Sequence, residues 1–191
     1  MDGSSSKERI ARIALGLFAR KGFESVGVKE IAEKSGLTKP SLYHHFGSKE
    51  GLLEAVLWED GRKLLDLTEK AAEYRRDITG NLHRLFGETL DFSLEHRDFF
   101  RLALRLFASA PETPGYKTGA ALRHKLTGIY RGLFAAATPD HGNMRGREAM
   151  YAETFWGLIA ACAALGMNGD AAFDETTRRR IVHQYMHGIF S

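Results

Sequence analysis

The chain contains 191 residues, and 43% of them are hydrophobic, which is enough to fold around a buried core. Its formal net charge is +3 at pH 7, by itself a weak indication of a polyanionic partner. A single cysteine excludes an internal disulfide framework and is compatible with a reducing compartment. The longest apolar run, residues 155–167, is shorter than a membrane span needs, and arginines interrupt the early apolar stretch where a secretory signal would lie. We therefore expect a cytoplasmic protein with no membrane partner.

The positive charge is concentrated at one end of the chain. The first 50 residues hold nine Lys/Arg and six Asp/Glu, a net charge of +3, whereas the remaining residues hold 18 of each. A polyanion such as DNA would therefore be attracted to the N-terminal segment, and the neutral remainder of the chain indicates a separate task.

Apolar residues recur at the spacing of three and four that is typical of amphipathic helices, and no segment alternates as a half-buried strand does. The pattern predicts an all-α protein of about nine helices, with three small helices first. Gly22 ends the first helix, and Gly/Pro-containing loops are expected near 77–80, 111–115, 138–142 and 166–170. The other predicted helices cover about 28–34, 39–45, 48 onward, 79–95, 97–108, 116–137, 146–166 and 174–190.

Residues 28–53 read VKEIAEKSGLTKPSLYHHFGSKEGLL, which predicts two short helices joined by a tight turn and followed by the start of another helix. Ile31, Ala32, Leu37 and Leu42 supply apolar positions at which two crossed helices pack. Gly36 lies where the chain must reverse, and a left-handed backbone is expected there.

The second of these short helices carries polar and basic side chains on its outer face. They are Thr38, Lys39, Ser41, Tyr43 and His44. Hydroxyl groups, a cation and aromatic rings are the groups that contact phosphates and base edges in a DNA groove. Because Thr38 is also a natural helix N-cap and Pro40 fits a first turn, the sequence predicts a helix-turn-helix motif over about 27–46.

Five segments closely resemble the DNA-binding domain of the TetR (tetracycline-repressor-like) transcriptional regulators, at the spacing of that family and without a gap. They are Gly22-Phe23, Val28–Ala32, Ser35–Leu37, Ser41–Phe46 and Ser48–Leu53. The resemblance covers about residues 7–57. It implies a helix-turn-helix domain over 4–50 and a larger helical domain over 51–191 that binds an effector and dimerises.

The resemblance also implies which side chains contact DNA, with the second helix of the motif lying in the major groove. The implied DNA-binding residues are Thr38, Lys39, Pro40, Ser41, Tyr43, His44 and Lys49. In this set Lys49 matches the phosphate-contacting lysine of the family, at a helix N-terminus that itself favours an anion. The sequence departs from the family at Gly27, where a Ser or Thr is usual, so a capping hydroxyl is missing there.

One recognition helix reads too few base pairs to be selective, so we expect a homodimer on a palindromic operator. Segment 146–166 carries small residues on one face and segment 174–190 carries a larger apolar stripe. The expected interface residues are Gly157, Ala160, Ala161, Ala164, Ile181, Tyr185 and Ile189. The opposite face of 146–166 is expected to pack in the core of its own chain, through Phe155, Leu158, Ile159, Cys162 and Leu165.

The middle of the chain is rich in aromatic residues, which favours an apolar pocket for a small effector, as the resemblance also implies. The candidate pocket residues are Phe86, Phe100, Phe107, Tyr130, Phe134 and Phe155. Polar groups that could orient an apolar or aromatic effector are His96, Arg105, His124 and Tyr130.

The sequence therefore predicts a ligand-responsive transcriptional repressor, with no catalytic residue, cofactor or metal. An effector-independent DNA-binding protein is the alternative. A helical metal-binding protein or enzyme is a further alternative, because His183 and His187 stand four residues apart on one helix. The sequence contains no phosphate-binding glycine loop, no nucleophile elbow and no HExxH pattern that would complete such a site.

Overall fold

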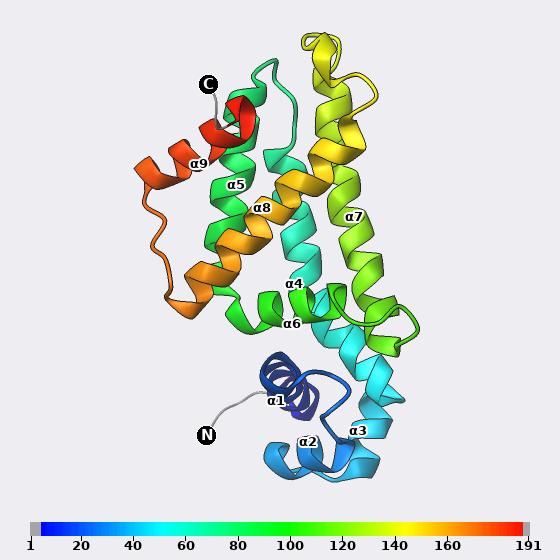
Figure 1. The fold of residues 1–191 in the computed structure, drawn as a ribbon. Coiled ribbons are helices and arrows are strands. Elements are labelled where there is room, and N and C mark those ends of the chain that lie inside the picture. The colour runs from blue at the N-terminus through cyan, green and yellow to red at the C-terminus, as the bar shows by residue number, and fades with distance from the viewer. Residues whose placement is uncertain (1–4, 189–191) are drawn as a thin grey trace. The chain divides into compact units, whose positions relative to one another are not determined.

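A computed structural model describes residues 5–188 and contains, within that range, nine α-helices, one short 3₁₀-helix and no strand (Figure 1). The predicted all-α fold class and the number of helices are confirmed. The elements are α1 Ser6–Lys21, α2 Val28–Ser35, α3 Lys39–Phe46, α4 Lys49–Ala71, α5 Ile78–Glu95, α6 Arg97–Phe107, α7 Pro114–Ala137, η1 Gly142–Met144, α8 Glu148–Asn168 and α9 Glu175–His187.

The predicted loop over 111–115 is wrong at its end, because α7 begins at Pro114. The Oγ1 atom of Thr113 accepts a hydrogen bond from the Tyr116 N–H at 3.2 Å, so Thr113 caps the helix. Proline is well suited to the first helical position, where its missing N–H would have no partner within the helix. A Pro-Gly pair therefore starts a helix here instead of lengthening the loop.

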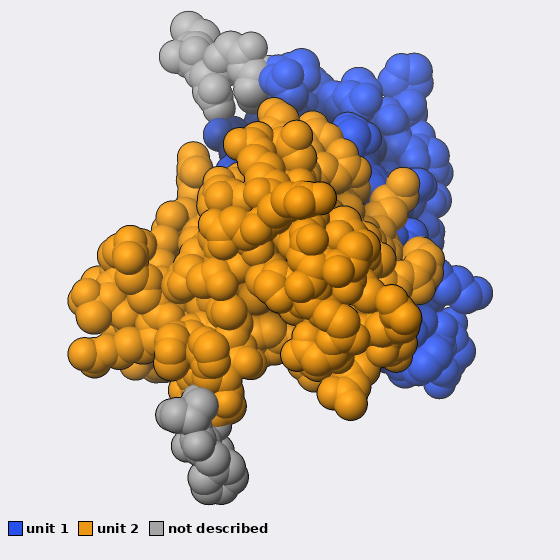
Figure 2. Space-filling view, turned by 90° about the horizontal axis from the view of Figure 1, so that it is seen from above, with its two compact units in different colours: residues 1–62, 96–123 blue, residues 63–95, 124–191 orange. Residues whose placement is uncertain are grey.

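The chain forms two compact units, coloured separately in Figure 2. Unit 1 comprises residues 1–62 and 96–123, and unit 2 comprises residues 63–95 and 124–191. Helices α4 and α7 are each shared, one part of the helix belonging to each unit. These two units are defined by contacts within the chain. The division by function, into a DNA-binding domain over 4–50 and an effector-binding domain over 51–191, stays a prediction.

In unit 1, α1 packs against α2, α3 and α6. Its buried face carries Ile10, Leu17 and Phe18, each no more than 1% exposed, which is the apolar spacing that predicted this helix. The ring of Phe18 meets the ring of Phe23 edge to face, with 5.3 Å between centroids. This core holds the two short helices α2 and α3 in place.

In unit 2, α8 and α9 both pack against α5. Helix α7 contacts α8 through aromatic rings: Tyr130 stacks on Trp156 at 6.2 Å and meets Phe155 edge to face at 6.1 Å. One helical turn further along α7, the ring of Phe134 lies 5.5 Å from that of Tyr151. Unit 2 is therefore built around an aromatic cluster.

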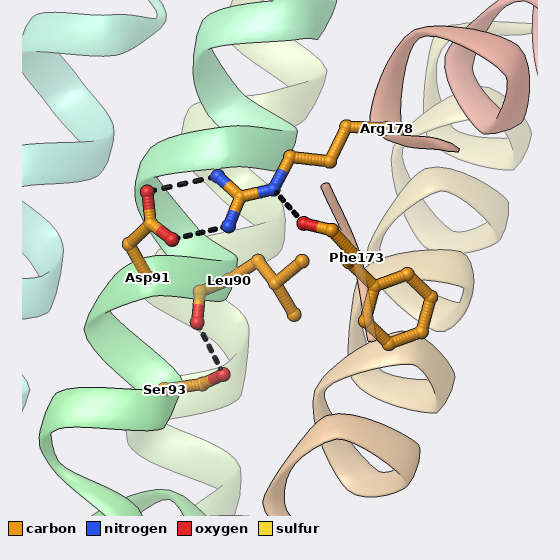
Figure 3. A network of polar contacts seen from close by, with 5 residues as sticks. All are labelled: Leu90, Asp91, Ser93, Phe173 and Arg178. Carbon is orange, nitrogen blue, oxygen red and sulfur yellow. Dashed lines mark hydrogen bonds and ion pairs between the residues drawn. The ribbon is translucent and has the colours of Figure 1, made fainter. Parts of the chain in front are cut away.

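Helix α9 is attached to α5 by the polar network shown in Figure 3. The guanidinium of Arg178 donates to both carboxylate oxygens of Asp91, one of them at 2.9 Å, and its Nε donates to the Phe173 carbonyl at 2.8 Å. The pKa of Arg178 is raised, chiefly by its hydrogen bonds to Asp91. The Arg178 side chain is 19% exposed and that of Asp91 is 61% exposed, so the fork is shielded from water on its arginine side only.

Within the described residues, α8 is the one helix that is long and apolar enough to cross a membrane. Its continuous apolar run, residues 155–167, is shorter than a membrane span needs. The core helix of a soluble protein satisfies the same test. Ala152, Phe155, Ile159 and Ala163 of α8 are buried within the protein, and 39% of its apolar window is buried in all.

We predict that Arg178→Ala lowers the melting temperature by about 2–6 °C, because the lost charge-assisted hydrogen bonds are worth about 1–2 kcal/mol. The control is Arg179→Ala on the same helix. Its partner Glu175 lies at 2.8 Å, but both side chains are 70% exposed, so the loss should be close to zero. Equal shifts of the two variants in a thermal melt would contradict the anchoring role of Arg178.

Candidate nucleic-acid interface

The turn between α2 and α3 has the geometry that its sequence predicted. Gly36 adopts φ 65° and ψ 28°, the left-handed conformation that glycine reaches without steric cost. The Leu37 N–H donates to the Ala32 carbonyl at 3.0 Å, and the Gly36 N–H donates to the Glu33 carbonyl at 3.1 Å. This pair of hydrogen bonds is a Schellman motif, which ends α2 and directs the chain into α3.

Helix α3 begins with the predicted cap, because the Thr38 hydroxyl accepts the Ser41 N–H at 3.3 Å. Leu42 is fully buried and fixes which side of α3 faces the protein. The other side carries the predicted DNA-binding residues. Thr38, Lys39, Pro40, Tyr43 and His44 are exposed, and Ser41 is half-buried.

Tyr43 is 47% exposed, so a large aromatic ring stands in water beside these polar groups. Rings of this kind contact phosphates or thymine methyl groups in protein–DNA complexes. The outer face of α3 thus has the residue types expected of a recognition helix, on a helix whose inner face is fixed by the core.

Lys39 differs in its charge environment from Lys21, Lys29 and Lys34. Lys21 donates to Glu30 at 2.7 Å, and Lys29 and Lys34 lie 3.7 Å from Glu33 and Glu30 respectively. In residues 5–188, no carboxylate lies within ion-pair distance of Lys39. Its charge is therefore available to a phosphate or to a guanine acceptor.

Lys49 is held by an aromatic ring that sequence reasoning did not connect with it. Its Nζ lies 4.2 Å from the centroid of the Phe23 ring, a cation–π contact. Burial lowers the pKa of Lys49, while the nearby carboxylates of Glu24 and Glu50 act in the opposite direction. In the sequence, Phe23 is distinguished only as part of the Gly22-Phe23 segment that resembles the TetR family. Nothing in the sequence pattern places its ring beside Lys49.

Helices α3 and α4 meet at a very close backbone approach. The Ser48 hydroxyl accepts the Gly51 N–H at 3.0 Å and caps α4. A Cβ atom at Gly51 would overlap the carbonyl oxygen of Phe46, the last residue of α3. Glycine is thus required for α4 to begin directly beside the end of α3.

Gly27 is the N-cap of α2 and, as expected, supplies no capping hydrogen bond from a side chain. Its φ of −88° is open to any residue, and a Cβ there would meet nothing within 4 Å. The missing hydroxyl is therefore a consequence of the residue type and is not imposed by the backbone.

The small residues predicted at a dimer interface lie on the outer side of α8. Gly157 and Ala161 are exposed, while Ala160 and Ala164 are half-buried. On α9, Ile181 and Tyr185 are half-buried, and Ile189 lies outside the described residues.

The prediction that Leu165 faces the core is wrong, because Leu165 is 45% exposed. Leu158 is half-buried, and Phe155, Ile159 and Cys162 are buried. The reason is geometric, because the two leucines are seven residues apart and border the stripe that contains Ala161. The outer face of α8 is therefore more apolar than predicted.

The six aromatic residues predicted to line an effector pocket do not all come together. Phe100 and Phe107 belong to unit 1, and the other four belong to unit 2. Five of the six are at most 2% exposed, and Phe107 is half-buried. Direct ring contact is found between Tyr130 and Phe155.

Two of the four polar residues suggested for the effector, His96 and Arg105, have other contacts. His96 Nδ1 lies 3.3 Å from the Asp60 carboxylate, and Arg105 donates to the Arg20 carbonyl at 3.4 Å. The rings of His183 and His187 lie 4.3 Å apart. Within residues 5–188, no third His, Cys, Asp or Glu joins them in a metal-binding cluster.

The family described as "Bacterial regulatory proteins, tetR family" matches residues 10–56. The uncharacterized HTH-type transcriptional regulator YvkB of Bacillus subtilis (strain 168) is 32% identical over 160 residues, which cover 81% of this chain and 79% of YvkB. The match covers a smaller part of other curated relatives. It spans 36% of YerO of Bacillus subtilis (strain 168) and 60% of UidR of Escherichia coli (strain K12).

Solved structures with a similar fold cover nearly the whole chain. The TetR family regulator PfmR of Thermus thermophilus has a TM-score of 0.75 and 25% identity, covering 98% of this chain and 99% of PfmR. FadR of Bacillus subtilis, solved in complex with stearoyl-CoA, has a TM-score of 0.77 and 15% identity, with coverage of 95% and 98%. At this identity the FadR match concerns the fold alone.

We predict that Gly51→Ala lowers the melting temperature by about 2–10 °C, because relieving the overlap with the Phe46 carbonyl costs about 1–3 kcal/mol. The control is Gly27→Ser, which introduces a Cβ at an open position with ordinary φ and adds a capping hydroxyl. Its melting temperature should be unchanged or slightly raised. If thermal melts show the same shift for both variants, the close approach at Gly51 is not a structural constraint.

Proposed function

Because this chain belongs to the TetR family of bacterial regulatory proteins, we propose that it is a DNA-binding transcriptional repressor. In this proposal it acts in the cytoplasm as a homodimer on a palindromic operator. A small apolar or aromatic effector releases it from DNA.

The observation that carries the proposal is the outer face of α3. Lys39, which has no carboxylate partner among the described residues, and Tyr43 at 47% exposure project from a helix whose buried side is fixed by Leu42. In the proposed complex, Lys39 donates to base edges or phosphate near the start of α3, and Tyr43 and His44 contact the groove further along. Lys49, held over the Phe23 ring, donates to a backbone phosphate.

Dimer formation is supported by the outer face of α8. Ala161 and Leu165 are exposed and Leu158 is half-buried, which leaves an apolar stripe that a second copy of the same face would bury in an isologous contact. The half-buried Ile181 of α9 would extend that interface. Two recognition helices on one dimer would then read the two half-sites of an operator.

The ligand response is supported by buried polar atoms in the aromatic cluster of unit 2. The hydroxyls of Tyr130 and Thr89 are fully buried, and within the described residues each has only the other as a polar contact. A polar group on a bound effector would give these hydroxyls a further hydrogen-bond partner. The proposed effector residues remain Phe86, Phe100, Phe107, Tyr130, Phe134 and Phe155.

In the proposed switch, α4 carries the effect of the ligand to the DNA-binding residues. It is one continuous helix that begins at Lys49 and has residues in both units. A ligand that favours one arrangement of α4 changes the separation of the two recognition helices. By linkage, operator DNA weakens effector binding by the same factor.

The experiment that tests DNA binding compares Lys39→Ala with Lys49→Ala in fluorescence anisotropy, using a random pool of double-stranded oligonucleotides and an operator selected from it. Lys39→Ala should weaken operator binding about 5- to 150-fold and reduce the preference for operator over pool. Lys49→Ala should weaken both alike and flatten the salt dependence by about one unit.

The control for these variants is Lys29→Ala, whose side chain already faces Glu33 and which should bind operator like the wild type. If the wild-type protein fails to bind any duplex of the pool at low ionic strength, the proposed function is wrong.

We predict that light scattering at micromolar concentration gives twice the chain mass of 21.3 kDa for the wild type. Ala161→Glu should shift this mass to that of a monomer, because it places a carboxylate in the apolar contact. Glu69→Arg, on the exposed side of α4, is the control and should stay dimeric. Circular dichroism of Ala161→Glu should show unchanged helix content. A monomeric wild type would contradict the dimer.

A further inference from the structure

An open pocket lies in unit 2 among elements that are distant in the sequence. It is bounded by the start of α5, the end of α7, η1, the start of α8 and the end of α9, and its volume is about 570 Å³. We name it the α5/α9 pocket. This volume falls within the range of about 300–1,000 Å³ that is typical of small-molecule sites.

The side chains of the α5/α9 pocket are adaptable and aromatic. Three methionines line it, Met144, Met150 and Met186, together with the aromatic rings of Phe134, Tyr151 and Tyr185. Methionine sulfur makes favourable contacts with aromatic rings and adapts to irregular shapes. The pocket is therefore suited to a flat aromatic molecule.

One wall of the pocket is already ordered. The Tyr185 hydroxyl donates to the Tyr151 carbonyl at 2.8 Å, and the Tyr185 ring lies 4.9 Å from that of Phe155. The Phe134 ring in turn lies 5.5 Å from the Tyr151 ring. A ligand would thus meet rings whose positions are already fixed. Binding would therefore not carry the entropic cost of immobilising these side chains.

The rim of the pocket leaves apolar surface in water. Met150 is 55% exposed, the highest value among the large hydrophobic side chains described as exposed. A ligand seated on the aromatic wall would cover this side chain and remove it from water, which is favourable.

The charges around the pocket restrict what it can hold. Among the described residues, no Lys, Arg, Asp or Glu side chain lines it, and its polar members are Thr79, His141, Asn143, Thr154 and His187. The neighbouring carboxylate of Asp140 accepts a hydrogen bond from Tyr74 at 2.9 Å. An anionic ligand would lack a permanent cation and an amine would lack a carboxylate, so a neutral ligand fits best.

We propose that the α5/α9 pocket binds a neutral aromatic molecule through the methionines and rings of α7, η1, α8 and α9. Of the six proposed effector residues, only Phe134 lines this pocket. The ring of Phe134 belongs to the aromatic cluster of unit 2, so the pocket lies where that cluster meets solvent. Binding of such a molecule does not depend on the proposed function. The further statement that this molecule is the effector does rest on it.

The test uses two fluorescent probes with similar ring systems and the full-length protein without DNA. N-phenyl-1-naphthylamine is neutral, and 8-anilinonaphthalene-1-sulfonate carries a sulfonate. The neutral probe should bind about once per chain and at least tenfold more tightly than the anionic probe. Equal or tighter binding of the sulfonate would overturn the proposed ligand class.

Variants then locate the probe. Met150→Glu places a carboxylate at the rim and should weaken binding of the neutral probe at least tenfold. Ala149→Glu is the matched control, because Ala149 is also exposed, is adjacent on α8 and does not line this pocket. If both variants bind the probe like the wild type, the molecule is held elsewhere and the proposal is wrong.

The regulatory role is tested separately. Saturating N-phenyl-1-naphthylamine should weaken operator binding by the wild type and leave that of Met150→Glu unchanged. If the probe occupies the pocket without affecting operator affinity, the site is not that of the effector. Because the titrations contain no DNA, failure of the proposed DNA binding would not alter their result.

Discussion

The close backbone approach of Gly51 to the Phe46 carbonyl is the constraint on which the proposed function depends. It allows α4 to begin directly beside the C-terminal end of α3, with only Gly47 and Ser48 between the two helices. The Phe23 ring holds the first residue of α4, Lys49, beside the same junction. A displacement of α4 would therefore move the recognition helix with it, because a two-residue connection is too short to absorb the movement.

The parts of the fold that were predictable depend on interactions between residues close in sequence. The left-handed turn at Gly36 and the Thr38 cap involve partners within five residues, so their residue types alone identify them. The outer face of α3 was predictable for the same reason, because burial of Leu42 fixes the helix rotation. The start of α7 at Pro114 was the exception, since Pro and Gly are typical both of loops and of a helix end.

The remaining features depend on residues that are far apart in the chain. The hydrogen bonds from Arg178 to Asp91 join positions 87 residues apart, and the α5/α9 pocket draws on five elements. Helical periodicity gives the direction of a side chain but not what lies opposite it. For this reason Leu165 was placed in the core, although it borders a face that the described residues leave uncovered.

The glutamates that face Lys21, Lys29 and Lys34 weaken the long-range electric field of the DNA-binding segment, although its lysines remain numerous. Association with random genomic sequence depends mainly on such long-range attraction to the phosphate backbone. In the proposed function, a protein with this charge arrangement would be less strongly retained at non-operator sites during its search. Its residence at the operator would then depend on the short-range fit of Lys39 and Tyr43, which would favour discrimination over speed of capture.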